Sequence, residues 1–230
     1  MKILEWDSNF FKFKVARMNP SENLEDELSH MKEENIKLAY FSSTNNDSKF
    51  IKRINDLGGE LIVKKANLKL TKIPLTENED KNIFSYSHNI LTKNLLDLTY
   101  QAGILSRYKL DPKFKKDDWK KMYKIWIERS LNGEIADEVL VYKENNKELG
   151  FITLKKDGGN GEIGLLAVDS NHREKHIATK LMNALFAKAI QMGLRSISVA
   201  TQEENVPAMK FYAKLGFKIE EIENIFHFWL

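Results

Sequence analysis

An alternation of strand-like and helix-like segments over the last seventy or so residues constrains the fold of this chain most strongly. Residues 161–168 (GEIGLLAV) are apolar, which predicts a buried strand. Residues 177–189 then carry an apolar side chain at every fourth position, the spacing of one helix face. Residues 195–201 (RSISVAT) alternate and are β-branched, which predicts a second strand. Because strands joined through a helix usually run parallel with a right-handed crossover, the sequence predicts a mixed α/β sheet flanked by helices.

Further elements are predicted on both sides of this segment. A helix begins at Asn205 and ends before Gly216, since glycine often follows a helix end. Downstream, a closing hairpin is predicted, and its last segment is expected inside the sheet and not at a dimer edge. Upstream, two helices and one hairpin are expected. The ranges are 217–222 with 225–229 for the closing hairpin, 91–101 and 118–131 for the helices, and 137–142 with 150–154 for the upstream hairpin.

The first third of the chain repeats the order of the last part in a weaker form. Asp47 can cap a helix between strand-like residues 37–41 and an extended segment 61–70, and Gly58–Gly59 end that helix. The alternative is that this order of elements is simply common. With a polar stretch following, we expect two domains. These are a degenerate half-domain over residues 1–75, which binds no cofactor, and a larger domain over residues 76–230.

Composition excludes several kinds of chemistry. The chain has 230 residues and no cysteine, so disulfides, thiol nucleophiles and Cys-ligated metals are ruled out. Its net charge of +3, with signs interspersed, does not favour a nucleic-acid partner. No apolar run approaches the roughly 20 residues of a membrane span, and we expect a soluble cytoplasmic protein. His172 and His176 straddle a turn and no carboxylate completes a set, so no metal site is expected.

Two groups of polar residues have a spacing that suits a ligand. Arg173 and Lys175 lie between the first strand and its helix, where free N–H groups and positive charge suit a diphosphate. Asn205 and Tyr212 are seven residues apart, so they share one helix face with the small Ala208 between them. Taken singly, Tyr212 is better explained as a core aromatic residue and Asn205 as a helix cap.

Taken together, these motifs resemble those of the GCN5-related N-acetyltransferase (GNAT) superfamily. Arg173-x-x-His176-x-Ala178 follows its pyrophosphate motif, Arg/Gln-x-x-Gly-x-Gly/Ala, except at His176. A side chain in place of glycine could crowd the ligand or require an unfavourable backbone, so weaker or rearranged binding is expected. The resemblance implies a mostly antiparallel mixed sheet flanked by helices. The later motif is matched completely, by Asn205, Ala208, Tyr212, Gly216 and Phe217.

The resemblance also implies a mechanism, with acetyl-CoA as co-substrate and no metal ion. Its pantetheine arm would pair with the strand before the turn, and a backbone N–H there would polarise the thioester carbonyl. An amine would attack directly, and Tyr212 would protonate the leaving thiolate. No base is assigned, although Glu162 is the nearest carboxylate in sequence. The residues implied in acetyl-CoA binding are Leu166, Ala167, Val168, Arg173, Glu174, Lys175, His176, Ile177, Ala178, Thr179, Asn205, Ala208 and Phe211.

Motifs upstream of this region indicate which class of amine the chain acetylates. Trp6-Asp7-Ser8-x-Phe10-Phe11, Ser106-Arg107-Tyr108 and Trp126-Ile127-Glu128 resemble the dTDP-fucosamine acetyltransferases, which acetylate the 4-amino group of a TDP-linked amino-deoxy sugar in surface-polysaccharide synthesis. Residues 109–124 hold seven lysines against three aspartates, and a nucleotide sugar offers a diphosphate and a base. The resemblance therefore implies that Arg107 and Tyr108 bind such an acceptor, unless the lysines are only a solvated helix face.

Two other functions stay open. The first is the same chemistry on another amine, such as a protein N-terminus or an antibiotic. The local excess of lysine argues against a polyamine. The second is an inactive relative that serves as a binding module, with its turn spoiled by His176. A homodimer is also left open.

Overall fold

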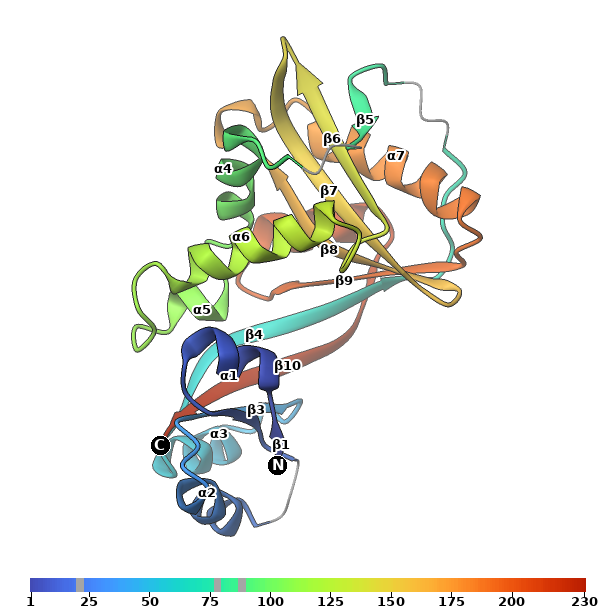
Figure 1. Cartoon of the computed structure of the whole chain (residues 1–230). Coiled ribbons are helices and arrows are strands. Elements are labelled where there is room, and N and C mark those ends of the chain that lie inside the picture. Colours follow the sequence, from blue (N-terminus) through green and yellow to red (C-terminus); the bar gives the residue numbers. More distant parts are fainter. Residues whose placement is uncertain (20–22, 77–79, 87–89) are drawn as a thin grey trace. The chain divides into compact units, whose positions relative to one another are not determined.

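A computed structural model of the chain describes residues 1–19, 23–76, 80–86 and 90–230. Its elements group into two compact units (Figure 1). Unit 1 comprises residues 1–66, 202–206 and 221–230, and unit 2 comprises residues 67–201 and 207–220. The division near residue 75 stays a prediction. Residues 77–79 and 87–89 of the polar stretch around it lie outside the described residues.

Unit 1 is built on two parallel strands joined by a helix. Its elements are β1 (Lys2–Ile3), α1 (Glu5–Phe11), β2 (Val15–Arg17), α2 (Leu24–Glu33), β3 (Leu38–Ser43), α3 (Ser48–Asp56) and parts of β4 (Gly59–Leu70) and β10 (Lys218–Trp229). β2 runs parallel to β3, with α2 as the crossover, and β10 pairs antiparallel with β3. The buried core includes Met31, Ile54 and Phe228.

The predicted order of strand, helix, glycine and strand in the first third is confirmed. Asp47 caps α3 by accepting a hydrogen bond of 2.9 Å from the N–H of Lys49. Gly58 has a left-handed φ of +90°, and a Cβ on Gly59 would lie 2.5 Å from the ring of Phe228. Both glycines are therefore required where α3 turns into β4. α1 and α2 were not predicted.

The predicted C-terminal hairpin is wrong, because β10 is one continuous strand. Asn224, placed in the expected turn, is fully buried and lies opposite Ser43. Its Nδ2 donates to the carbonyl oxygen of Asn45 (3.0 Å) and to Oδ1 of Asn46 (2.8 Å). These bonds satisfy the amide's donors without a turn. β10 lies between β3 and β4, so the expectation of an interior strand is confirmed.

Unit 2 is a mostly antiparallel sheet that contains one parallel pair. Its elements are β5 (Ile83–Ser85), α4 (Lys93–Ala102), α5 (Arg107–Leu110), α6 (Asp118–Leu131), β6 (Glu138–Glu144), β7 (Lys147–Asp157), β8 (Asn160–Val168), α7 (Ile177–Gln191), β9 (Ser196–Gln202) and α8 (Val206–Lys214), the last two sharing residues with unit 1. Its strands follow the order β5-β6-β7-β8-β9 (Figure 1); the described pairings along this order are antiparallel, except that β8 and β9 are parallel.

Helices cover both faces of this sheet. A Cβ on Gly150 would lie 3.0 Å from Ile177 and 3.1 Å from Leu181, so α7 packs closely on that face. The next residue, Phe151, points to the other face and is buried against α4 and α6. The expected mixed, mostly antiparallel sheet flanked by helices is confirmed, and α6 has both of its predicted ends. None of the helices in the described part of the chain is long and apolar enough to cross a membrane.

Candidate active site

β8 and β9 separate partway along their length. Parallel pairing joins residues 160–163 of β8 to residues 196–199 of β9 and then stops. Beyond that point, residues 166–168 pair with β7 on one side. Within the pairings that the structure describes, the other side of this segment has no strand partner. The C-terminal half of β8 therefore offers a free strand edge.

A β-bulge marks the point of separation. Gly164 and Leu165 of β8 together lie opposite Thr153 of β7, and the register shifts there by one residue. The N–H of Leu165 donates to Thr153 Oγ1 at 2.9 Å. A bulge reorients the strand that follows it. This bulge therefore decides which backbone groups of residues 166–168 face the free edge.

Two hydrogen bonds fix which backbone groups face that edge. The N–H of Leu165 donates to Thr153, and the N–H of Asp169 donates to a β7 carbonyl at 2.9 Å. Both bonds point towards β7. Because N–H directions alternate along a strand, the N–H groups of Leu166 and Val168 face the free edge.

The turn after β8 begins with a network around Asp169. This carboxylate accepts a hydrogen bond of 2.9 Å from the N–H of Asn171 and lies 3.4 Å from Nζ of Lys147. The bond from Asn171 is the main cause that holds the pKa of Asp169 below its ordinary value, and Lys147 adds to it against the effect of burial. Gln101 of α4 accepts a bond of 2.9 Å from the N–H of Ser170. The start of the turn is thus anchored to β7 and α4.

The end of the turn is strained and open. Glu174 and His176 have left-handed φ angles of +65° and +58°, so His176 adopts the backbone for which glycine is favoured. His176 is the residue before α7, and no side chain caps the first turn of that helix. Arg173 and Lys175 are exposed, and neither forms an ion pair within the described residues. Uncapped N–H groups beside two cations suit an anion.

Tyr212 is the buried residue of α8. Its side chain is 4% exposed, and its ring centroid lies 5.4 Å from those of Phe211 and Phe217. Burial alone raises the pKa of the Tyr212 phenol above its ordinary value. Ala208 and Phe211 are half-buried on the same helix, and Asn205 directly precedes it. A phenol held neutral in this way can donate a proton but is a poor base.

Arg107 and Tyr108 belong to an aromatic cluster on α5 and α6. Arg107 Nη2 donates to the Tyr108 hydroxyl at 2.7 Å, and its guanidinium lies 4.7 Å from the centre of that ring. The Tyr108 ring packs against Phe114 and Trp126, at 5.7 and 6.0 Å between centroids. Tyr123 packs 4.9 Å from Trp126, and burial raises its pKa to about 12. The cluster joins a cation to several stacked aromatic faces.

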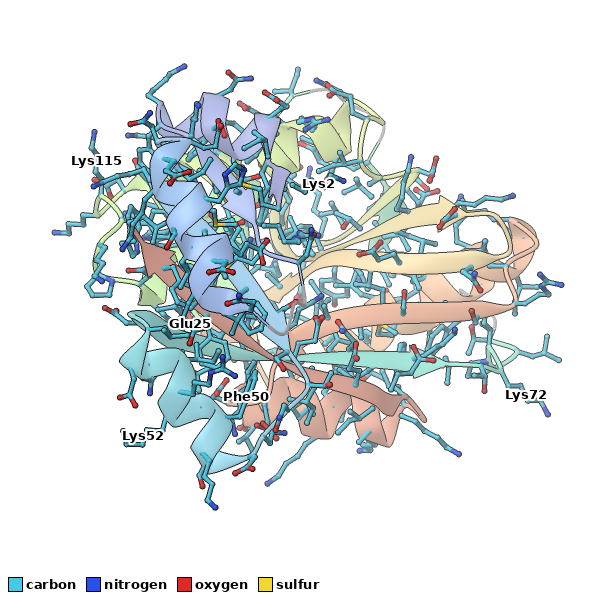
Figure 2. The ribbon with its side chains drawn as sticks, turned by 90° about the horizontal axis from the view of Figure 1, so that it is seen from below. Lys2, Glu25, Phe50, Lys52, Lys72 and Lys115 are labelled. Carbon is cyan, nitrogen blue, oxygen red and sulfur yellow. The ribbon has the colours of Figure 1, made fainter. Side chains whose placement is uncertain are left out.

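The lysines of residues 109–124 are mostly a solvated face. Lys115 projects away from the ribbon (Figure 2). Lys109 lies 5.1 Å from the Trp119 ring. The ion pairs along α6 are Lys120–Asp117, Lys121–Asp118 and Lys124–Glu128. Such exposed pairs contribute little and favour the solvated explanation for these three lysines.

The described residues contain no competing site at a metal cluster or in the hollow beside β5. Across the described residues, no three His, Asp or Glu side chains gather as metal ligands. A hollow of about 450 Å³ lies between β5 and the C-terminal half of α7, where Ile83 and Ala187 help to line it. None of the residues predicted to form the site lines this hollow, and Ile177, Ala178 and Thr179 lie at the other end of α7.

Comparison with known proteins decides the family. The Acetyltransferase (GNAT) family matches residues 103–217, which is half of the chain. This match takes in the separating strands, the turn and Tyr212. The chain belongs to the acetyltransferase (GNAT) family. The resemblance of its motifs is thereby confirmed at the level of the family and the fold.

Relatives of this GNAT chain match parts of it. It is 27% identical over 138 residues to the spore coat polysaccharide biosynthesis protein SpsD of Bacillus subtilis, covering 60% of this chain and 47% of that protein. It is 29% identical over 119 residues to an uncharacterized N-acetyltransferase of Methanocaldococcus jannaschii, covering 47% of this chain and 50% of that protein. The matched stretch thus spans about half the length of these curated relatives.

The fold is also found in solved structures. A GCN5-related N-acetyltransferase from Sphaerobacter thermophilus superimposes with a TM-score of 0.57 at 16% identity, covering 90% of this chain and 68% of that chain. At this identity the likeness supports the GNAT fold and nothing finer.

Two features of this region were not predicted from the sequence. The bulge at Gly164–Leu165 was not predicted, although a glycine inside an apolar strand often marks one. The buried Tyr123 was also missed, because its contacts with Trp126 and Tyr108 depend on how α5 and α6 pack together.

Proposed function

We propose that this chain is an acetyl-CoA-dependent N-acetyltransferase whose acceptor is the 4-amino group of a nucleotide-linked amino-deoxy sugar. The observation that carries the proposal is the free edge of β8 directly before the uncapped start of α7. An extended thioester needs a strand edge and its diphosphate needs an anion site. Both lie here on one short stretch of a GNAT chain.

The turn fits a diphosphate in the chemistry of its donors. Arg173 and Lys175 would supply positive charge, and the N–H groups of residues 177–179 would donate to phosphate oxygens. Glu174 and His176 set the backbone of the turn through their left-handed φ angles. Residues 166–168 would pair with the extended arm of the ligand. Asn205, Ala208 and Phe211 stay predicted contacts.

The proposed step is direct attack by a neutral amine on the thioester carbonyl that acetyl-CoA supplies. A C–N bond forms while the C–S bond breaks. The N–H of Leu166 or Val168 stabilises the negative charge on the carbonyl oxygen. Tyr212 gives its proton to the departing sulfur, and the amine nitrogen loses a proton to a base or to water.

Glu162 is a poor candidate for direct contact with that amine. It is exposed and lies four residues before Leu166, which is about 13 Å along a strand. It could take the proton only through intervening water. The base therefore stays unassigned in this proposal.

The acceptor is proposed to lie against Arg107 and Tyr108. A guanidinium suits a diphosphate, and the aromatic cluster suits a planar base. The printed role of SpsD in polysaccharide biosynthesis supports a sugar acceptor. Three α6 lysines are held in ion pairs and give the sugar acceptor no further support, so another primary amine stays as the alternative. The second alternative is an inactive binding module, in which the His176 side chain would crowd the diphosphate.

The test combines calorimetric titration with acetyl-CoA and a thiol-release assay on a panel of TDP- and UDP-linked amino sugars. Binding plus thiol release with a TDP-linked 4-amino-4,6-dideoxyhexose is the expected result. Release with unrelated amines alone would keep the acetyl transfer and discard the sugar. No binding at millimolar acetyl-CoA would discard both and leave the binding module.

A further inference from the structure

A buried hydroxyl group lies beneath the bulge of β8. Thr153 is 2% exposed and sits on the central strand β7, opposite Val139 on one side and the bulge on the other. Its Oγ1 accepts the N–H of Leu165 at 2.9 Å. A valine would have nearly the same shape without the acceptor. The hydroxyl is therefore a specific polar contact inside an apolar face of the sheet.

Gly164 allows this contact to form. A Cβ at this position would lie 3.0 Å from Thr153 Oγ1, closer than nearly all real contacts of a Cβ atom. Gly164 is itself exposed, so packing on its outer side does not demand a small residue. The close approach to Thr153 is the reason that the structure gives for a glycine there.

We propose that Thr153 is a positioning residue for acetyl transfer, because its hydrogen bond to Leu165 fixes the bulge that turns the N–H of Leu166 towards the free edge of β8. One extra residue inverts the alternation of the strand that follows it. Without the bulge, the N–H of Leu166 would point towards β7. Thr153 itself touches neither ligand. The inference rests on the proposed function, since the N–H of Leu166 has a task only when a thioester carbonyl lies beside it.

Two substitutions separate the hydroxyl from the shape of the side chain. Thr153→Val removes the acceptor, and Thr153→Ser keeps it. We expect kcat for acetyl transfer to fall roughly 10- to 100-fold in Thr153→Val, as for a misaligned oxyanion donor, and to recover in Thr153→Ser. The Kd of CoA without its acetyl group should change less than about threefold, because the turn residues that hold the diphosphate are untouched.

Amide hydrogen exchange at Leu165, measured by NMR, tests the hydrogen bond without any activity. Exchange should be faster than wild type in Thr153→Val and close to wild type in Thr153→Ser. Gly164→Ala provides a second variant in case Thr153→Val folds poorly. Its Cβ would push the hydroxyl away, and we expect the same faster exchange and lower kcat.

Three results would overturn the inference in distinguishable ways. Unchanged exchange in Thr153→Val would show that the hydroxyl does not hold the bulge. Faster exchange with unchanged kcat would make Thr153 a structural residue only. A wild-type chain that transfers no acetyl group would remove the proposed function together with this inference, whatever the exchange rates of the variants.

Discussion

The guanidinium of Arg107 holds the hydroxyl of the residue next to it, Tyr108, at 2.7 Å, and lies against the same ring at 4.7 Å. Adjacent side chains of a helix seldom meet, because they point about 100° apart. Here α5 has only four residues, and the Tyr108 side chain is buried. The contact places a cation at the rim of an aromatic cluster.

We expect Arg107→Ala to raise KM for the acceptor about tenfold or more, because a charge-assisted bond to a diphosphate is lost. kcat and the Kd of acetyl-CoA should stay close to wild type, since Arg107 belongs to the proposed acceptor site. Steady-state kinetics with both substrates varied measure this. Lys121→Ala is the matched control, because Lys121 is an exposed cation already paired with Asp118. Equal KM values in the two variants would remove Arg107 from the acceptor site.

Tyr212→Phe should lower kcat about 100-fold while acetyl-CoA still binds, because the leaving thiolate loses its acid. Burial raises the Tyr212 pKa, and an acid works below its pKa. Loss of kcat through ionisation of Tyr212 should therefore begin only above the ordinary phenol pKa of about 10. A pH profile of kcat for both proteins checks this. Tyr142→Phe, another buried tyrosine, serves as the control. Equal kcat for wild type and Tyr212→Phe at every pH would refute the role.

His176→Gly should tighten acetyl-CoA binding about threefold or more, because it frees the turn from a left-handed side-chain residue. Removing the left-handed strain should raise the free energy of unfolding, and the greater entropy of glycine in the unfolded chain should lower it. We expect a net gain of up to about 1 kcal/mol. Asn146→Gly is the matched control. Asn146 has a φ of +61° in the β6–β7 turn, remote from the site, so stability should rise without a change in Kd. Equal Kd values in all three proteins would show that His176 does not restrict binding.

Asp80→Asn should cost about 0.5–1 kcal/mol of unfolding free energy at pH 7, since Lys180 is partly exposed and solvent screens the pair. Burial raises the pKa of Asp80, but the hydrogen bonds from Lys180 and Asn82 and the charge of Lys180 outweigh it, so the pKa is lowered. Because the pKa of Asp80 is lower in the folded chain than in the unfolded chain, its carboxylate stabilises the fold at pH values above the unfolded-state pKa. This stabilisation is lost as the pH falls through the folded-state pKa.

The difference between wild type and Asp80→Asn should therefore vanish below roughly pH 3, as urea unfolding at several pH values would show. Asp56→Asn is the control, because the Lys52–Asp56 pair is exposed on both sides and should contribute little. A constant difference from pH 7 to pH 3 would contradict the assigned cause.

The helices of unit 2 could be predicted because their information is local. The apolar spacing and flanking residues of α6 and α7 mark the helices within one stretch of chain. β10 could not be predicted as one strand, because what allows Asn224 inside the sheet is an acceptor pair on the β3–α3 loop, about 180 residues earlier. A sequence pattern carries no trace of that distant partner.

The candidate site divides in the same way. The turn and the helix of Tyr212 were predicted from spacing, since both are short motifs. The bulge depends on a side chain of the neighbouring strand, Thr153, and was missed. The left-handed backbone at His176 fits the sequence pattern, because the pyrophosphate motif of the family usually has glycine at this position.

The pairing of β3 with β10 has a consequence for how the chain is made. The strand around residue 40 pairs with a partner around residue 226, so unit 1 cannot be completed until the intervening residues have been synthesised. β5 to β9 instead pair with one another across shorter separations, the longest being the 59 residues between Ile83 of β5 and Tyr142 of β6. β5 to β9 can therefore pair before β10 has been synthesised, with Phe41 and its neighbours still uncovered. During synthesis, those uncovered side chains are where a chaperone would be needed most.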